Sequence, residues 1–372
     1  MLNQNLKVFN LCLSPSEGGL EFCVVKFAKK LKEEGCDSIV VCLPDSLIYK
    51  KSKAANLKTL TIKSGSFLPA FIHTAFMIRK YKPNLIITHR SPGLKRSALH
   101  KIFFPHLRII SVLHTLFKSS KKDWLHRFFY SKVDEFVVFT KIQKLNACEY
   151  LPIDKSNVKI IPHTVDTKIF RPSQSKKQIK KSIVPLIGCV GRFDLKKGQI
   201  ELIKAAKKLK DKGLHFNLAF VGQDTKNEEG IRKKCENFVK EFQLEDCIQF
   251  FDHKADIFEY YRTFDVFVMP SFEETFGLVL IEAMASGCLC ISTQAGGPIE
   301  ILDEGKAGIL VVPKSPESLE LALEDVLKNP FAYNQIKING LKRVQEKYSD
   351  SSFGTDLSLI LKTVKYSELE SA

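Results

Sequence analysis

The run PSFEETFGLVLIEAMASG, residues 270–287, specifies a strand–loop–helix unit in this 372-residue chain. It follows the buried-strand pattern DVFVM, and it predicts a polar loop with Glu273 and Glu274 before a helix that begins near Gly277. Glu282 lies inside the apolar helical pattern VLIEAMA, where a carboxylate needs a partner. A ribose diol or a nearby basic side chain would each supply one.

The same alternation extends in both directions along the chain. Strand patterns occupy residues 6–13, 38–43, 85–88, 109–113, 135–139 and 158–161, and again 184–190, 217–221, 248–251, 265–269, 288–292 and 308–311. Continuous apolar strands between helices indicate parallel sheets that are covered on both faces. The polar run SQSKKQIKKS, residues 173–182, is the predicted linker.

These patterns predict an α/β protein with two doubly wound Rossmann-like domains that face each other across a cleft. The first covers residues 1–172 and the second residues 183–350, and residues 351–372 form a helix that packs back toward the first domain. Ligands of such folds bind at the carboxyl ends of the strands, so the cleft is the expected site.

Composition narrows the class of protein. Hydrophobic residues make up 44% and charged residues 26% of the chain, which are globular values. We expect no membrane span and no signal peptide, because the longest mostly apolar run, residues 67–78, is too short and the first residues lack the charged and apolar segments. Ten scattered cysteines without a CxxC pair favour a reducing, cytoplasmic location.

The positive charge is concentrated in the first half. Residues 1–171 contain 29 Lys and Arg against 12 Asp and Glu, whereas the remainder contains 28 against 29. A one-sided field of this kind indicates an anionic partner, which would be nucleic acid, an acidic membrane surface or a phosphorylated substrate.

Two further motifs carry chemistry. Arg192 and Lys197 lie in CVGRFDLKKG, residues 189–198, after a strand, where a guanidinium and an ammonium suit phosphate oxygens. Gly18 and Gly19 lie in SEGGLE, residues 16–21, at the start of a predicted helix. His114 ends the strand pattern IISVLH.

Together these motifs resemble family 4 retaining glycosyltransferases of the GT-B fold. The resemblance rests on the two glutamates eight residues apart, on CVGRFDLKKG, SEGGLE and VGQD, on IIPHTVDTKIFRP (residues 160–172) and on TQAGGPIE (residues 293–300), and it covers nearly the whole chain. It implies that Arg192 and Lys197 clamp a nucleotide diphosphate and that Glu282 orients the ribose. It also implies that Glu274 and the amides of Thr275, Phe276 and Gly277 hold the donor sugar. Gly18 and Gly19 then approach the donor phosphate and the acceptor, and His114 lies near the transferred sugar and the acceptor. The first domain is thereby expected to bind the acceptor and the second the nucleotide sugar.

The implied reaction moves a hexose from a nucleotide-diphosphate sugar, with a UDP-sugar favoured, to a hydroxyl of a glycan or glycolipid, with retention. Bacterial lipopolysaccharide or surface polysaccharide assembly is the favoured pathway. No DxD pair occurs, so we expect no metal and no cofactor, and no covalent nucleophile is assigned. A nucleotide-sugar epimerase of the same fold and a basic nucleic-acid-binding protein are the alternatives, although no recognition helix or RNA-binding motif is present.

The sequence departs from the family pattern at three positions. His163-Thr164 stands where Asn-Gly is common, Asp252 where glycine is usual near the nucleobase, and Leu289 where proline is common.

The segment KSSKKDWLHRFFYSK, Lys118–Lys132, predicts a helix with Trp124 and Phe128 four residues apart on one apolar stripe. The stripe either packs into the first domain's core or docks, with its lysines, on the anionic inner face of the cytoplasmic membrane.

Overall fold

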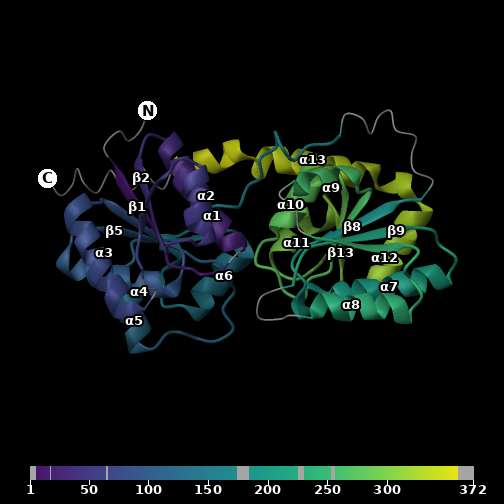
Figure 1. Ribbon diagram of the computed structural model, residues 1–372, viewed down its shortest axis with the longest axis horizontal. Helices are drawn as coiled ribbons and strands as arrows, with labels where there is room; N and C mark the ends of the chain where they lie inside the picture. Colours follow the sequence, from purple (N-terminus) through teal and green to yellow (C-terminus); the bar gives the residue numbers. More distant parts are fainter. Residues whose placement is uncertain are drawn as a thin grey trace. The chain divides into compact units, whose positions relative to one another are not determined.

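The chain forms two compact units in the computed structural model, which describes residues 6–16, 18–63, 66–173, 184–224, 230–252 and 256–358 (Figure 1). The first unit contains the described residues up to His163 and those from Phe353 onward, and the second spans Thr164–Ser352. Residues 174–182 of the predicted linker and 359–372 of the predicted C-terminal helix lie outside the described residues. The described part of that helix, residues 350–358, places Phe353 edge-on against Phe27 of the first unit, with ring centroids 5.0 Å apart.

The first unit is a parallel sheet of seven strands in the order β3-β2-β1-β4-β5-β6-β7. Its strands are β1 (Lys7–Cys12), β2 (Asp37–Cys42), β3 (Lys58–Thr61), β4 (Leu85–Thr88), β5 (Arg108–Val112), β6 (Glu135–Val138) and β7 (Val158–Ile160). Its helices are α1 (Gly19–Glu33), α2 (Leu47–Ala54), α3 (Phe67–Tyr81), α4 (Ser91–Phe103), α5 (Trp124–Tyr130) and α6 (Lys141–Tyr150). The strand order reverses between β1 and β4, which is where ligands bind in sheets of this kind.

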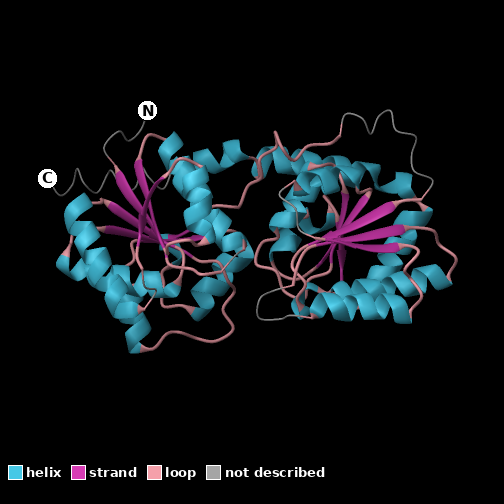
Figure 2. Cartoon of the chain, viewed as in Figure 1, coloured by secondary structure: helices cyan, strands magenta, loops and turns pink. Residues whose placement is uncertain are grey.

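The alternation of side chains along each strand produces two cores in this unit. Ile39 and Val41 join a cluster with α3 on one face of the sheet. Val40 and Cys42 face the other way and pack with α1 and α2. Successive strand residues point to opposite faces, so a strand buried on both faces is apolar throughout. Helices on both faces of each sheet are visible in Figure 2.

The second unit is a parallel sheet of six strands in the order β10-β9-β8-β11-β12-β13. The strands are β8 (Leu186–Val190), β9 (Asn217–Val221), β10 (Ile248–Phe251), β11 (Val266–Met269), β12 (Leu289–Thr293) and β13 (Ile309–Val311). The longer helices are α7 (Gln199–Asp211), α8 (Ile231–Glu241), α9 (Ile257–Thr263), α10 (Leu278–Ala285), α11 (Gly297–Ile301), α12 (Pro316–Lys328) and α13 (Asn334–Lys347). Here the order reverses between β8 and β11, and the predicted class of two doubly wound α/β sheets is confirmed.

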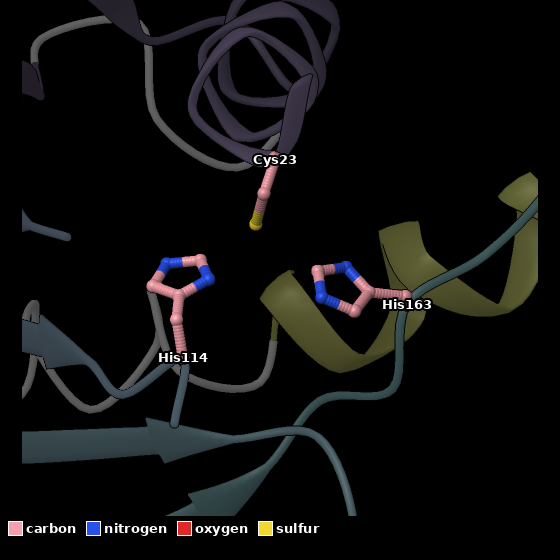
Figure 3. A group of neighbouring side chains, drawn as sticks. All are labelled: Cys23, His114 and His163. Atoms are coloured by element: carbon pink, nitrogen blue, oxygen red, sulfur yellow. The ribbon is translucent and has the colours of Figure 1, made fainter. Parts of the chain in front are cut away.

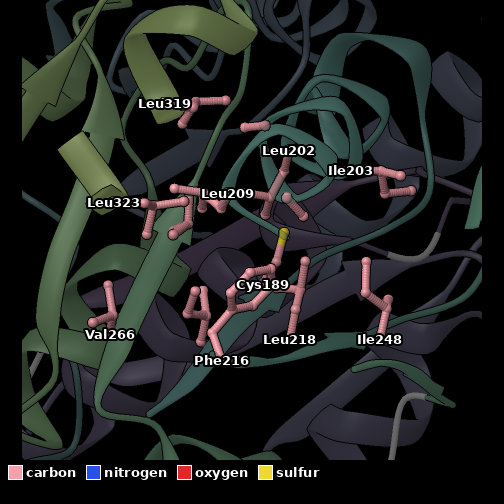
Figure 4. Packing of buried hydrophobic residues seen from close by; sticks show 14 of the residues in the cluster. Cys189, Leu202, Ile203, Leu209, Phe216, Leu218, Ile248, Val266, Leu319 and Leu323 are labelled. Carbon is pink, nitrogen blue, oxygen red and sulfur yellow. The ribbon is translucent and has the colours of Figure 1, made fainter. Parts of the chain in front are cut away.

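The main core of the second unit lies under α7 and α12. Leu202 and Leu209 of α7 pack with Leu319 and Leu323 of α12 against the strand residues of β8, β9 and β10 (Figure 4). Burying one such side chain stabilises a fold by about 1.5–3 kcal/mol, so this interface fixes α7 on the sheet. That position matters because the loop between β8 and α7 carries Arg192 and Lys197.

The cysteines behave as buried apolar residues. The ten form no disulfide bonds, and eight are buried, while Cys148 and Cys247 are partly exposed. Burial raises the pKa of the Cys12 thiol to about 12, so that group stays protonated at neutral pH.

Candidate functional site

Three predicted site residues of the second unit lie in the loops that follow β8 and β11, the two strands between which the strand order reverses. Arg192 follows β8 and is exposed, and Lys197 ends the short 3-10 helix Leu195–Lys197. Glu274 lies in the loop after β11, where its Oε2 accepts a hydrogen bond from Nζ of Lys197 at 2.7 Å. The side chain of Lys197 is 29% exposed and that of Glu274 is 18% exposed, so the pair is accessible but not freely solvated. Two residues that are 77 positions apart in sequence therefore form one polar centre.

Close backbone contacts hold this centre together. Gly198 follows Lys197 with φ +69°, and a Cβ there would lie 2.0 Å from the carbonyl oxygen of Pro270. The amide of Phe272 also donates to the carbonyl of Lys196 at 2.7 Å. Only glycine combines this conformation with so close an approach, so the loop after β8 is fixed on the loop after β11.

The predicted sugar-binding loop, Glu274–Gly277, packs against a second glycine turn. The amide of Glu274 donates to the carbonyl of Ala295 at 3.1 Å, and the amide of Gly297 donates to the carbonyl of Glu274 at 2.9 Å. Thr275 is half-buried, whereas Phe276 is buried and contacts the ring of Tyr348 edge-on. Gly277 caps α10 with φ +107°. The loop is thus fixed on both sides, and its carboxylate remains beside Lys197.

Glu282 has a buried hydrogen-bond donor as a partner. Its Oε2 accepts from the phenol of Tyr261 at 2.8 Å, and burial raises the pKa of Tyr261 well above its usual value. α10 buries the neighbours of Glu282 on both sides, while Glu282 itself is half-buried.

The departure at Asp252 is explained by an ion pair. Asp252 follows β10 and pairs with the guanidinium of Arg232, which also contacts Glu236 at 3.2 Å. Asp224 of the VGQD motif contacts the same segment, because its carboxylate accepts hydrogen bonds from the backbone amides of Gly230 and Arg232 at the start of α8. Leu289 is simply buried in β12.

His114 and the glycine pair belong to the first unit. His114 lies two residues beyond β5 and lines a pocket of about 440 Å³ with Arg90, Lys118 and Lys121. Burial lowers the pKa of His114 to about 3, so its imidazole is neutral at physiological pH. Gly18 caps α1 with extended backbone, and Gly19 is the first residue of α1. The pocket lies at the carboxyl ends of β4 and β5.

Sequence reasoning did not identify the polar network beside this pocket. Ser14 donates to the buried Glu21 at 2.5 Å and accepts from Arg90 at 3.3 Å. His89 lies beside His114, with Nδ1 of His89 3.2 Å from Nε2 of His114. Arg90 and His89 directly follow β4, so their position after a strand at the order reversal was the available signal.

The turn that contains His163-Thr164 is buried. The ring of His163 stacks on Phe139 with centroids 3.7 Å apart. The hydroxyl of Thr164 donates to Asp350 at 2.8 Å. Both replacements therefore have well-packed surroundings, and His163 brings a second imidazole near His114 (Figure 3).

The predicted amphipathic segment is helical only over α5, Trp124–Tyr130, and not over the whole of Lys118–Lys132. Trp124 is 79% exposed, and Leu125 and Phe128 are each 39% exposed, so this part of the stripe does not enter the core. Tyr130 is buried. α4 packs against both α5 and α3, and α3 exposes a row of apolar side chains four residues apart, Leu68, Ile72 and Phe76. No helix among the described residues combines the length and apolarity needed to cross a bilayer.

Comparison with known proteins covers most of the chain. Residues 17–169 match the family described as Glycosyltransferase Family 4, and residues 170–343 match Glycosyl transferases group 1. The lipopolysaccharide core biosynthesis mannosyltransferase LpcC of Rhizobium leguminosarum bv. viciae is 28% identical over 51% of this chain and 55% of that protein. A probable sucrose-phosphate synthase of Thermosipho melanesiensis is 28% identical over 72% of this chain and 67% of that protein. The match to LpcC thus spans only about half of the length of LpcC. The match to a sucrose synthase of Solanum tuberosum spans 23% of the length of that enzyme.

Solved structures support the same assignment at the level of fold. A glycosyltransferase from Rickettsia africae superimposes with a TM-score of 0.85 at 22% identity and covers 96% of this chain and 98% of its own. Anabaena HepE in complex with UDP-glucose gives a TM-score of 0.82 at 18% identity over 96% of this chain and all of its own. With both halves of the sequence matched and both sheets shared, the chain belongs to family 4 of the glycosyltransferases, with the GT-B fold.

Proposed function

We propose that the protein transfers a hexose from a nucleotide-diphosphate sugar to a hydroxyl of a glycan or glycolipid acceptor, with retention at the anomeric carbon. The observation that carries this proposal is the pairing of Lys197 with Glu274 at 2.7 Å, with the exposed Arg192 in the same loop as Lys197. In a nucleotide-sugar donor the diphosphate is bonded directly to the sugar. A binding site for it therefore needs a cation for the diphosphate next to a polar group for the sugar, and Lys197 and Glu274 provide these two groups.

The leaving diphosphate is held by Arg192 and Lys197. An ammonium group has three N–H donors, and the contact with Glu274 uses one, so two remain for phosphate oxygens. The planar guanidinium of Arg192 can bind two oxygens at once. Both groups stabilise the negative charge that develops as the bond to the sugar breaks.

Glu274 accepts hydrogen bonds from donor-sugar hydroxyls, with the loop amides of Thr275, Phe276 and Gly277 beside it. The carboxylate of Glu282 accepts hydrogen bonds from the ribose hydroxyls, while the hydroxyl of Tyr261 donates to its Oε2 and holds the side chain in place. No covalent nucleophile is assigned, and the leaving phosphate takes the acceptor proton on the same face of the sugar. No metal is needed in this scheme, so transfer is expected to persist in EDTA, and a magnesium-restorable loss would contradict it.

The acceptor is assigned to the first unit, where Arg90, Lys118 and Lys121 line the pocket with His114. Their positive charge favours an anionic acceptor. The neutral imidazole of His114 positions the acceptor or a sugar hydroxyl by hydrogen bonding, and Gly18 and Gly19 stand at the start of α1 for close approach. Lipopolysaccharide or surface polysaccharide assembly is the favoured pathway, which the similarity to LpcC supports.

A donor panel tests the reaction. UDP-glucose, UDP-galactose, GDP-mannose and ADP-glucose are first screened by thermal shift, with UDP favoured because HepE was solved with UDP and UDP-glucose. Release of nucleoside diphosphate is then measured with and without lipopolysaccharide core acceptors. Lys197→Ala should lower acceptor-dependent release by ~10²-fold or more. Lys196→Ala, which changes the exposed neighbour, should not.

The outcomes separate the alternatives. Acceptor-independent conversion of the nucleotide sugar would indicate an epimerase. Salt-resistant retention of nucleic acid in a filter assay without any turnover would indicate a nucleic-acid-binding protein. Equal activity in the Lys197 and Lys196 variants would refute the proposed diphosphate site.

We also propose that the first unit docks on the inner face of the cytoplasmic membrane. The support is the exposed apolar side chains of α3 and α5, together with Lys121, Lys122 and Arg127. Apolar side chains beside basic ones suit a surface that enters the headgroup layer, and each basic residue adds ~1 kcal/mol near an anionic leaflet.

Sedimentation with vesicles tests this docking. Binding should require anionic lipid, decrease as salt rises, and weaken when Lys121, Lys122 and Arg127 are replaced by serine. Replacing Leu68, Ile72 and Phe76 by serine should also weaken it. Leu321→Ser, at an equally exposed site of α12, is the matched control. Equal binding to neutral and anionic vesicles, or no binding to either, would contradict docking.

A further inference from the structure

Three side chains of the first unit that commonly bind metals point into one space (Figure 3). They are Cys23 from α1, His114 from the loop after β5 and His163 from the turn after β7. The sulfur and one nitrogen of each ring all lie within 4.8 Å of one another. Residues from three distant parts of the sequence therefore converge with their ligand atoms inward, and neither the diphosphate site nor the membrane surface uses this arrangement.

The ring orientations are already fixed for binding. Nε2 of His114 lies 3.2 Å from Nδ1 of His89, which leaves Nδ1 of His114 for the shared space. His163 is stacked on Phe139 with an interplanar angle of 22°. Such outer contacts orient ligand histidines in metal sites, and here they exist before any ion binds.

The ligand atoms suit a cation. An ion that binds the sulfur of Cys23 displaces the thiol proton. One sulfur and two imidazole nitrogens are a soft to intermediate set, which suits Zn²⁺ and not Mg²⁺ or Ca²⁺.

The dimensions allow a tetrahedral ion with one open position. Zn–S and Zn–N distances of ~2.3 and ~2.0 Å place the ligand atoms ~3.3–3.6 Å apart, so atoms that lie within 4.8 Å of one another need to approach by at most ~1.5 Å. His114 also lines the pocket of about 440 Å³, which gives a fourth ligand such as water a route to the ion. Cys23 is only 3% exposed, so entry is from the pocket side.

We propose that Cys23, His114 and His163 form a Zn²⁺ site in the first unit, with the fourth position open toward the pocket. The diphosphate and donor-sugar sites do not use these three residues, whereas His114 is shared with the proposed acceptor pocket, where a bound ion would replace its direct hydrogen bond to the acceptor. Metal binding is measured without substrate, so its failure is distinguishable from a failure of the proposed function. On binding, the Cys23 thiol becomes a thiolate and its proton passes to solvent.

The test uses the full-length, metal-stripped protein and Co²⁺ as a spectroscopic substitute for Zn²⁺. One equivalent of Co²⁺ should give a near-ultraviolet thiolate-to-metal charge-transfer band and the strong visible bands of a tetrahedral ion, and Zn²⁺ should remove both. Absence of the charge-transfer band in the unmodified protein overturns the proposal, whatever the variants do.

Variants assign the ligands. Cys23→Ala should abolish the charge-transfer band, and His163→Asn should weaken Co²⁺ binding at least tenfold. His163→Asn introduces the residue that the family commonly has, so it is expected to fold, and circular dichroism verifies both variants. Cys148→Ser is the matched control, because Cys148 is a partly exposed thiol of the same unit outside the cluster. A band that survives Cys23→Ala or disappears in Cys148→Ser refutes the assignment.

Discussion

Gly198→Ala tests whether the diphosphate loop depends on its close contact with the loop after β11. The added Cβ would lie 2.0 Å from the carbonyl oxygen of Pro270, whereas ordinary contact begins at 3.4 Å. One of the two loops must therefore move by roughly 1.4 Å. Lys197 is the adjacent residue, so its ammonium group moves with the loop.

Two costs add at this position. Alanine with φ near +69° costs about 1 kcal/mol relative to glycine, and forcing a methyl group into an occupied space costs a further ~1–3 kcal/mol. Displacement of a catalytic group by ~1 Å lowers the rate by about 10²-fold. We therefore expect a clear loss of stability and a larger relative loss of transfer.

Gly213→Ala is the matched control. Gly213 has φ +74°, and no atom lies within 4 Å of its added Cβ, so only the backbone cost applies there. Urea denaturation gives the free energy of unfolding of both variants, and kcat/KM for the donor gives the effect on transfer. If Gly198→Ala matches Gly213→Ala in both measurements, the contact with Pro270 does not position the site.

Three further predictions concern single side chains. Arg192→Ala should lower kcat/KM by ~10²-fold with the fold intact, and an unchanged rate would remove it from the diphosphate site. Glu282→Ala should weaken nucleotide binding and cost about 1–3 kcal/mol of stability, because the buried phenol of Tyr261 loses its acceptor; Glu282→Gln should recover the stability only. Unchanged nucleotide affinity by calorimetry in a folded Glu282→Ala variant would exclude the ribose role. Burial lowers the pKa of His100 to about 4, so between pH 6.5 and 4 the unfolded chain binds its proton first, and this residue should contribute about 1.4 kcal/mol per pH unit to the fall in the free energy of unfolding, in addition to the buried His89, His114 and His163. His100→Leu should make the decline in urea titrations shallower by that amount, and an identical slope would contradict the assignment.

The strands of both sheets could be predicted because a strand buried on both faces is a continuous apolar run. The pattern failed at β3, whose sequence KTLT lies at the edge of the sheet and is only partly buried. The other edge strands, β7, β10 and β13, could be predicted because each contains at least two apolar residues, whereas KTLT contains only one. Sequence periodicity thus missed the edge strand whose composition does not distinguish it from a loop.

The predicted chemistry was most complete where a motif is local. Arg192 and Lys197 share one short loop, and their common location followed from the sequence. The contact of Lys197 with Glu274 depends on the order of strands, which no local pattern contains. Likewise, no local pattern joins Cys23 of α1 to His114 and His163, which come from other parts of the chain and meet only in the folded unit.

The buried cysteines of both units can be used to measure local unfolding. Each unit has one partly exposed cysteine, Cys148 in the first and Cys247 in the second, and four buried ones, which are Cys12, Cys23, Cys36 and Cys42 in the first and Cys189, Cys235, Cys288 and Cys290 in the second. A thiol reagent can reach a buried sulfur only when the surrounding structure opens. Mass spectrometry of alkylated peptides, taken at successive urea concentrations, would therefore give separate opening free energies for the two units in one sample without an added label.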